Sequence, residues 1–157
     1  MRIITTPFAA FVLACLSFAQ PGTPDPTFGT GGKVSLQLDG QPTNGFAVAF
    51  TQDDMVVVAG QTGNPAMPFV MRFLQDGQPD AGFGTNGTVI LSLAANETGE
   101  FRSVLVDGMG RVVAAGSKGP TGIGGIGQRD ALLARFTSTG ALDNSFAASG
   151  IAITNLS

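Results

Sequence analysis

Several residue types that support common enzyme chemistries are missing from this chain. It contains no His, no Tyr and no Trp, and its single cysteine is Cys15. Without His, serine–histidine and cysteine–histidine nucleophilic pairs and histidine-ligated zinc sites are excluded. The missing Trp and Tyr remove the rings on which sugars usually stack. These absences favour a protein that is not an enzyme.

Charged residues are also scarce. Eight Lys and Arg stand against 11 Asp and Glu, for a net charge of −3, so the basic surface that nucleic acid or an anionic membrane would require is missing. We expect no nucleic acid and no membrane surface as partners, and we expect no cofactor. Glycine is abundant instead, with 23 residues, about twice its usual share. This composition excludes a helical bundle and favours a turn-rich all-β fold.

The first 19 residues have the features of a secretory signal. Arg2 precedes an apolar stretch over residues 8–16, and Ser17-Phe18-Ala19 places small residues at the −3 and −1 positions of a cleavage site. We predict cleavage after Ala19 and a secreted or cell-envelope location. A lipobox-like Val12-Leu13-Ala14-Cys15 leaves lipidation at Cys15 as an alternative.

The remaining chain, residues 20–157, is internally repetitive. DPTFGTGGKV, which starts at Asp25, matches DAGFGTNGTV, which starts at Asp80, and a partial third copy starts at Asp143. Between these copies, a hairpin sequence ending in VVVAG at Gly60 matches one ending in VVAAG at Gly116. Repeats of this length are supersecondary units that bury their faces by stacking. We predict one β-propeller-like repeat domain with about two repeats.

Each repeat is expected to contain four short strands, and one extra strand is expected before them. The predicted ranges are 33–38 for the extra strand, 46–51, 55–60, 68–74 and 88–93 for the first repeat, and 101–106, 111–116, 130–136 and 150–156 for the second. Continuous apolar runs at 47–50, 56–59 and 112–115 predict strands covered on both faces, whereas alternation at 34–38 and 89–93 predicts half-exposed outer strands. The predicted fold is all-β, with two four-stranded antiparallel β-propeller-type blades plus one extra N-terminal strand, an incomplete propeller.

The recurring residues follow one pattern: an Asp-x-Ser/Thr-Phe-Gly start, a Gly-Lys-Val strand, a hairpin ending in Val-Val-Ala-Gly, then Ala-Arg-Phe and a Gly turn. Matching positions are Asp25, Phe28, Gly29, Gly32, Lys33, Val34, Val57, Val58, Ala59, Gly60, Arg72, Phe73, Gly77, Asp80, Phe83, Gly84, Val113, Ala115, Gly116, Ala134, Arg135, Phe136 and Gly140. This pattern resembles the delta-60 repeat, a bacterial β-propeller-like domain of unknown function. The sequence departs from it at Ala147, where Gly is expected, and at Gly82, where Ser or Thr is usual. The resemblance implies a propeller fold and no particular activity.

Ten recurring residues are interpreted as structural positions of the repeat. They are Asp25, Phe28, Gly60, Arg72, Asp80, Phe83, Gly116, Arg135, Asp143 and Phe146. Each Asp stands three residues before a Phe, so its carboxylate can accept from the backbone N–H groups of the next turn while the ring enters the core. Arg72 and Arg135 each stand eight residues before an Asp, which predicts an Arg–Asp contact between the third strand and the start of the next blade; an anion-binding pair of arginines is the alternative. Calcium sites are the alternative reading, but calcium needs six to eight oxygens and no second carboxylate recurs beside each copy.

Two glycine-rich motifs and four carboxylates are the remaining candidates for functional residues. Gly122–Gly127 satisfies G-x-G-x-x-G but leads into a predicted strand, and 29–33 lacks the first Gly and the Ser/Thr of a phosphate loop. Both are interpreted as turns. Asp53, Asp54, Glu97 and Glu100 could supply glycoside hydrolysis, but neighbouring acidic residues on polar turns are usually solvated.

Two blades cannot close a ring, because propellers use four to eight. Phe28, Phe83, Phe146 and the apolar strands would leave open faces, so we expect a homo-oligomer, association with other propeller blades, or a fragment of a longer propeller. The leading function is an exported, non-catalytic repeat module that acts as an extracellular or cell-envelope interaction or scaffold protein, with residues 117–129 as its most accessible loop. The alternatives are a carbohydrate-binding propeller assembled from several chains and, third, an enzyme.

Overall fold

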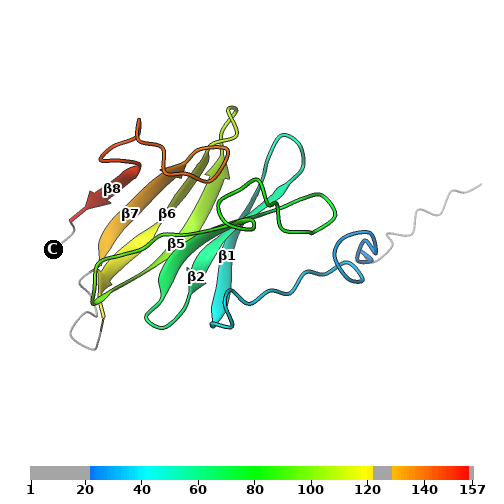
Figure 1. Cartoon of the computed structure of the whole chain (residues 1–157), viewed down its shortest axis with the longest axis horizontal. Helices are drawn as coiled ribbons and strands as arrows, with labels where there is room; N and C mark the ends of the chain where they lie inside the picture. The colour runs from blue at the N-terminus through cyan, green and yellow to red at the C-terminus, as the bar shows by residue number, and fades with distance from the viewer. Residues whose placement is uncertain (1–21, 122–128, 156–157) are drawn as a thin grey trace, which may run out of the picture.

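The computed structural model describes residues 22–121 and 129–155 and consists of two antiparallel sheets (Figure 1). In chain order, the first contains β1 (Thr43–Phe50), β2 (Val56–Thr62), β3 (Met67–Phe73) and β4 (Thr88–Ile90). The second contains β5 (Glu97–Val106), β6 (Val112–Pro120), β7 (Asp130–Phe136) and β8 (Ile151–Thr154). Neither sheet closes into a barrel, and within the described ranges no helix is present, let alone one that could cross a membrane. The predicted fold of two four-stranded blades is confirmed.

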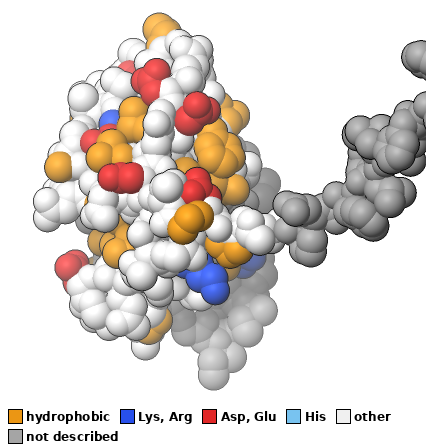
Figure 2. Space-filling model, turned by 90° about the vertical axis from the view of Figure 1, so that its right-hand side faces the viewer, with side chains coloured by type: hydrophobic (Ala, Val, Ile, Leu, Met, Phe, Trp, Pro, Cys, Tyr) orange, Lys and Arg blue, Asp and Glu red, His pale blue; other side chains and the backbone are white. Residues whose placement is uncertain are grey.

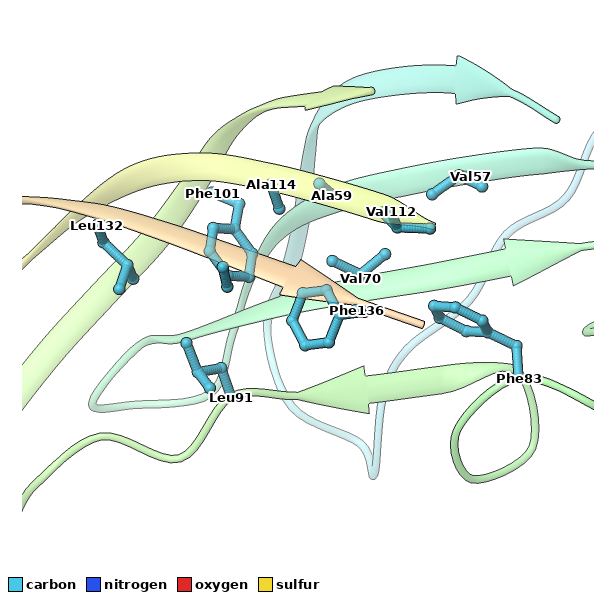
Figure 3. Packing of buried hydrophobic residues seen from close by; sticks show 11 residues of the cluster. Val57, Ala59, Val70, Phe83, Leu91, Phe101, Val112, Ala114, Leu132 and Phe136 are labelled. Atoms are coloured by element: carbon cyan, nitrogen blue, oxygen red, sulfur yellow. The ribbon is translucent and has the colours of Figure 1, made fainter. Parts of the chain in front are cut away.

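The two sheets pack against each other through one hydrophobic core. β5 lies against β1, β2 and β3, and side chains from both sheets meet between them (Figure 3). Phe83, Phe101 and Phe136 are fully buried there, and the rings of Phe101 and Phe136 meet edge to face with centroids 6.3 Å apart. Burial of aromatic rings dominates the energetics of such small cores. The core therefore belongs to the junction between the blades and not to either blade alone.

A second, smaller cluster covers part of the opposite face of the first sheet. It contains Phe69, Met71 and Phe73 of β3, against which Val34 and Leu38 of the N-terminal segment pack. The segment 33–38 was predicted to be an extra strand, and this prediction is wrong. It makes only isolated bridges, Gly29 with Lys33 and Leu38 with Gln41, because no third sheet is present in the described residues to pair with it.

The apolar run 47–50 was predicted to be covered on both faces, and the structure contradicts this for one face. Val48 and Phe50 are 59% and 64% exposed, although Val58 and Val56, their register partners on β2, are half-buried. The N-terminal segment reaches β2 and β3 but leaves this end of β1 uncovered. The apolar pattern at 47–50 indicates residues that favour burial on both faces, but it does not indicate which part of the chain would bury them.

The remaining strand boundaries differ from prediction by a few residues. β5 begins at Glu97 and β6 extends to Pro120, so this hairpin is longer than expected, whereas β4 ends at Ile90. The predicted signal at 1–19, its cleavage site after Ala19 and Cys15 lie outside the described residues, as do residues 122–128 of the inserted loop.

Candidate functional site

The junction between the blades is organised around Arg72 on β3. Its Nε donates to Oδ2 of Asp80 at 2.7 Å, its Nη2 lies 2.6 Å from the same oxygen, and its Nη1 donates to the carbonyl of Ser138 at 2.7 Å. The guanidinium also lies 4.7 Å from the centroid of the buried Phe83 ring. Asp80 lies in the β3–β4 connection of the first sheet, and Ser138 lies in the β7–β8 connection of the second. One side chain therefore connects the two blades.

The second repeat contains the same arrangement, and no further blade follows it among residues 129–155. Arg135 Nε donates to Asp143 Oδ2 at 2.8 Å, and the guanidinium lies 4.8 Å from the Phe146 ring. Its Nη2 donates to Ser145 Oγ at 3.0 Å. The Arg–Asp contact predicted from the eight-residue spacing is thus present in both repeats. In the chain as described, however, no later turn offers Arg135 the carbonyl that Ser138 offers Arg72.

Each repeat start docks on the turn of the next blade. The N–H of Gly84 donates to the carbonyl of Thr139 at 2.9 Å, and the N–H of Gly29 donates to the carbonyl of Asp76 at 2.7 Å. Thr139 and Asp76 hold the same position in the β7–β8 and β3–β4 connections, each just before a glycine with positive φ. The segment that follows Asp25 therefore binds the first sheet as the segment that follows Asp80 binds the second sheet.

The three repeat aspartates also stabilise their own turns. Oδ1 of Asp25, Asp80 and Asp143 accepts from the backbone N–H two residues later, at 2.9, 2.9 and 3.0 Å. For Asp143 the hydrogen bonds from Ser145 hold the pKa below its ordinary value. Burial acts to raise the pKa of Asp80, but the Gly82 N–H and Arg72 outweigh it and the pKa is lowered. These carboxylates are charged structural acceptors.

Gly60 and Gly116 are required by a bulge at the first strand of each sheet. The register between β1 and β2 shifts between Gly45 and Ala47, and that between β5 and β6 shifts between Phe101 and Ser103. A Cβ at Gly60 would overlap the carbonyl oxygen of Asn44 and lie 2.9 Å from its carbon, and a Cβ at Gly116 would meet Glu100 in the same way. The sequence indicated that these glycines recur, but it did not reveal the bulges.

A hollow of about 570 Å³ lies between the N-terminal segment and the first sheet. Its lining is mostly apolar and includes Phe28, Leu36, Val58 and Met71. The side of the molecule that carries this segment shows separate hydrophobic areas among acidic side chains (Figure 2). A hollow lined in this way marks incomplete covering of a sheet.

The carboxylates considered for catalysis do not converge. Asp53 and Asp54 are exposed on the β1–β2 turn, where Asp54 has a φ of 57°. Glu97 pairs with Lys118 across the β5–β6 hairpin, and Glu100 pairs with Arg102 at 3.0 Å. A glycosidase needs two carboxyl groups facing one bond. Each of these four residues is instead placed on a turn or in an ion pair.

The remaining motifs are a glycine-rich turn and isolated acidic residues in the part that the structure describes. Residues 29–33 form a turn in which Gly29, Gly31 and Gly32 have positive φ, and the glycine motif 122–127 lies outside the described residues. Across 22–121 and 129–155, no three acidic side chains gather as metal ligands would. Sequence reasoning missed the bond from Arg72 to Ser138, because nothing in the residue types marks a backbone carbonyl as a partner.

Comparison with protein families identifies the repeats. Residues 51–83 and 110–146 match the family described as "Domain of unknown function (DUF5122) beta-propeller". Each match begins in the turn before the second strand of a sheet. It ends at the Phe whose ring lies beside the arginine guanidinium, which is Phe83 in the first match and Phe146 in the second. A comparison with curated proteins finds no match. Two stretches of the chain, one in each repeat, are therefore similar to a β-propeller domain of unknown function.

Proposed function

We propose that this protein is an exported, non-catalytic β-propeller repeat module of the delta-60 type that acts as an extracellular or cell-envelope scaffold. The observation that carries the proposal is that both outer sheet faces remain apolar and partly open. Val48 and Phe50 are exposed on the first sheet, and Leu105, which is 53% exposed, stands on the far face of the second. Open apolar faces of this kind mark protein interaction sites.

The partner that these faces favour is another propeller blade, from a second copy or from another chain. The core between the sheets shows that this repeat type is stabilised by face-to-face stacking of blades. The structural roles of Arg72, Asp80 and Asp143 leave few charged groups for a reaction. The absence of a catalytic role is tested by screening the protein for hydrolase activity. Any activity that is found is then compared between wild type and Asp53→Asn. Dependence of such an activity on Asp53 would overturn the proposal.

Export rests on the sequence of residues 1–19 and is tested separately. The protein is expressed with its own leader, and the mature N-terminus is sequenced from culture medium and envelope fractions. We expect a chain that begins at Gln20. An N-terminal lipid on Cys15 would replace the secreted form with an anchored one, and full-length protein retained in the cytoplasm would contradict export.

The scaffold role is tested by the native mass of the processed protein and by its ligands. Light scattering at increasing concentration, and on material taken directly from the producing cells, is expected to show assemblies larger than one chain. A monomer under both conditions, without a bound partner, would contradict the scaffold. Specific binding on a glycan array, lost on unfolding, would support the carbohydrate-binding alternative instead.

A further inference from the structure

The interface between the two sheets provides a template for the contacts that the two open faces can make. Val104 and Val106 of β5 occupy the register positions that Val48 and Phe50 occupy on β1. Val104 and Val106 are half-buried against the core because the first sheet covers them. Val48 and Phe50 lack this cover. The first sheet therefore presents the face that accepts a preceding blade.

The second sheet presents the complementary face. Its far side consists of Leu105, Val113, Leu133 and Ala152, which stand at the register positions of the face that the first sheet packs against the second. Arg135 on this side repeats Arg72 but has no following turn carbonyl among the described residues. The outer faces of the two sheets thus correspond to the two halves of the junction between them.

The N-terminal segment occupies part of the accepting face. Val34 and Leu38 pack on β3, and Gly29 donates to the Asp76 carbonyl, as Gly84 donates to Thr139. Within the chain, this backbone hydrogen bond comes from Gly84, the residue after Phe83. In a head-to-tail pair, the equivalent donor would be Ala147, the residue after Phe146. Ala147 already has a φ of 45°, close to the 58° of Gly29 and Gly84. Both segments would use the same carbonyl.

We propose that the segment Asp25–Leu38 is a built-in cap that competes with the Asp143–Thr154 segment of a second copy for the outer face of the first sheet. With the cap bound, the chain is a single unit. When the cap leaves, the second sheet of another copy docks head to tail, and Val48 and Phe50 become covered. This inference rests on the scaffold role proposed above and identifies its partner as a second copy.

The test uses sedimentation velocity on the processed protein over a range of concentrations. Val34→Asp removes an apolar cap contact and is expected to shift self-association to concentrations at least about tenfold lower than wild type. Adding Leu105→Glu or Phe50→Glu to Val34→Asp is expected to abolish association, because each charge blocks one half of the contact. Both residues are more than half exposed, so the folded chain tolerates the charge. Met109→Glu, an equally exposed apolar-to-acid change on the β5–β6 turn, is the matched control and should change nothing.

Mixing the two double variants is the decisive measurement. Val34→Asp/Leu105→Glu retains only the accepting face, and Val34→Asp/Phe50→Glu retains only the donating face, so the mixture is expected to form a one-to-one dimer and nothing larger. If Val34→Asp does not fold, Phe28→Ser, which alters a half-buried ring of the cap, replaces it. A folded cap variant that stays monomeric to about 1 mM overturns the inference. The inference is also overturned if the wild-type chain self-associates and neither Leu105→Glu nor Phe50→Glu weakens that association. The scaffold role would then remain intact.

Discussion

Replacement of Arg72 by Met tests whether one guanidinium holds the two blades together. The change removes two contacts to Asp80, the bond to the Ser138 carbonyl and the cation–π contact with Phe83. Breaking a buried ion pair costs about 3–5 kcal/mol, but Asp80 is 13% exposed at its side chain and keeps the Gly82 N–H, so about 2–4 kcal/mol is expected. At about 3 °C per kcal/mol for a domain of this size, the melting temperature should fall by about 6–12 °C.

The assay is thermal and urea unfolding followed by circular dichroism, with two comparison variants. Arg135→Met removes the equivalent contacts to Asp143 and Phe146 but no bond to a following turn, so its effect should be clearly smaller. Arg102→Met removes a side chain that is 61% exposed and should cost less than about 1 kcal/mol. If Arg72→Met were no more destabilising than Arg102→Met, the connecting role assigned to Arg72 would be refuted.

Three further predictions follow from the same packing. Gly116→Ala should lower the free energy of unfolding, measured by urea titration, by about 2 kcal/mol or more, because the added Cβ meets the Glu100 backbone. Gly108→Ala is the control and should be nearly neutral, because the nearest atom to its Cβ is 3.9 Å away. Phe136→Ala should lower the free energy of unfolding by about 3–5 kcal/mol because the Phe136 ring is fully buried. Met109→Ala, which removes an exposed side chain, is the control for this urea titration. The pKa of Asp80 is lowered on folding, so its stabilising effect is complete above its ordinary pKa of 3.8 and is lost as the pH falls below that value. The urea midpoint should therefore be level between about pH 7 and 5 and fall below about pH 4, and a midpoint that rises on acidification would contradict this.

The blade architecture was predictable because two periodic signals agree in the sequence. Apolar runs such as Val112–Ala115 recur at the same place in each repeat as the hairpin glycines Gly60 and Gly116, and this fixes both strand identity and register. The Arg–Asp contact could be inferred because both partners are side chains at a constant spacing. These parts of the fold depend on residue type alone.

Other features could not be read from residue types. The bulges at β1 and β5 depend on where the first strand approaches Gly60 and Gly116, and the bond from Arg72 to Ser138 ends on a backbone carbonyl that any residue provides. The alternation in 33–38 places Val34 and Leu38 against β3, but Leu36 on the same face is 41% exposed, and strand formation also needs an edge to pair with. Val48 and Phe50 are exposed for a related reason, because no blade among the described residues covers that face of the first sheet.

The order of elements at the blade junction has an evolutionary consequence. The segment that covers each sheet precedes that sheet in the chain, 25–38 for the first and 80–93 for the second, and each is held by a glycine N–H on a turn carbonyl. Duplication or loss of one whole unit within the gene would therefore recreate the same contacts at the new boundary. Related genes are expected to differ in length by integral numbers of this unit, with no compensating substitutions where the units meet.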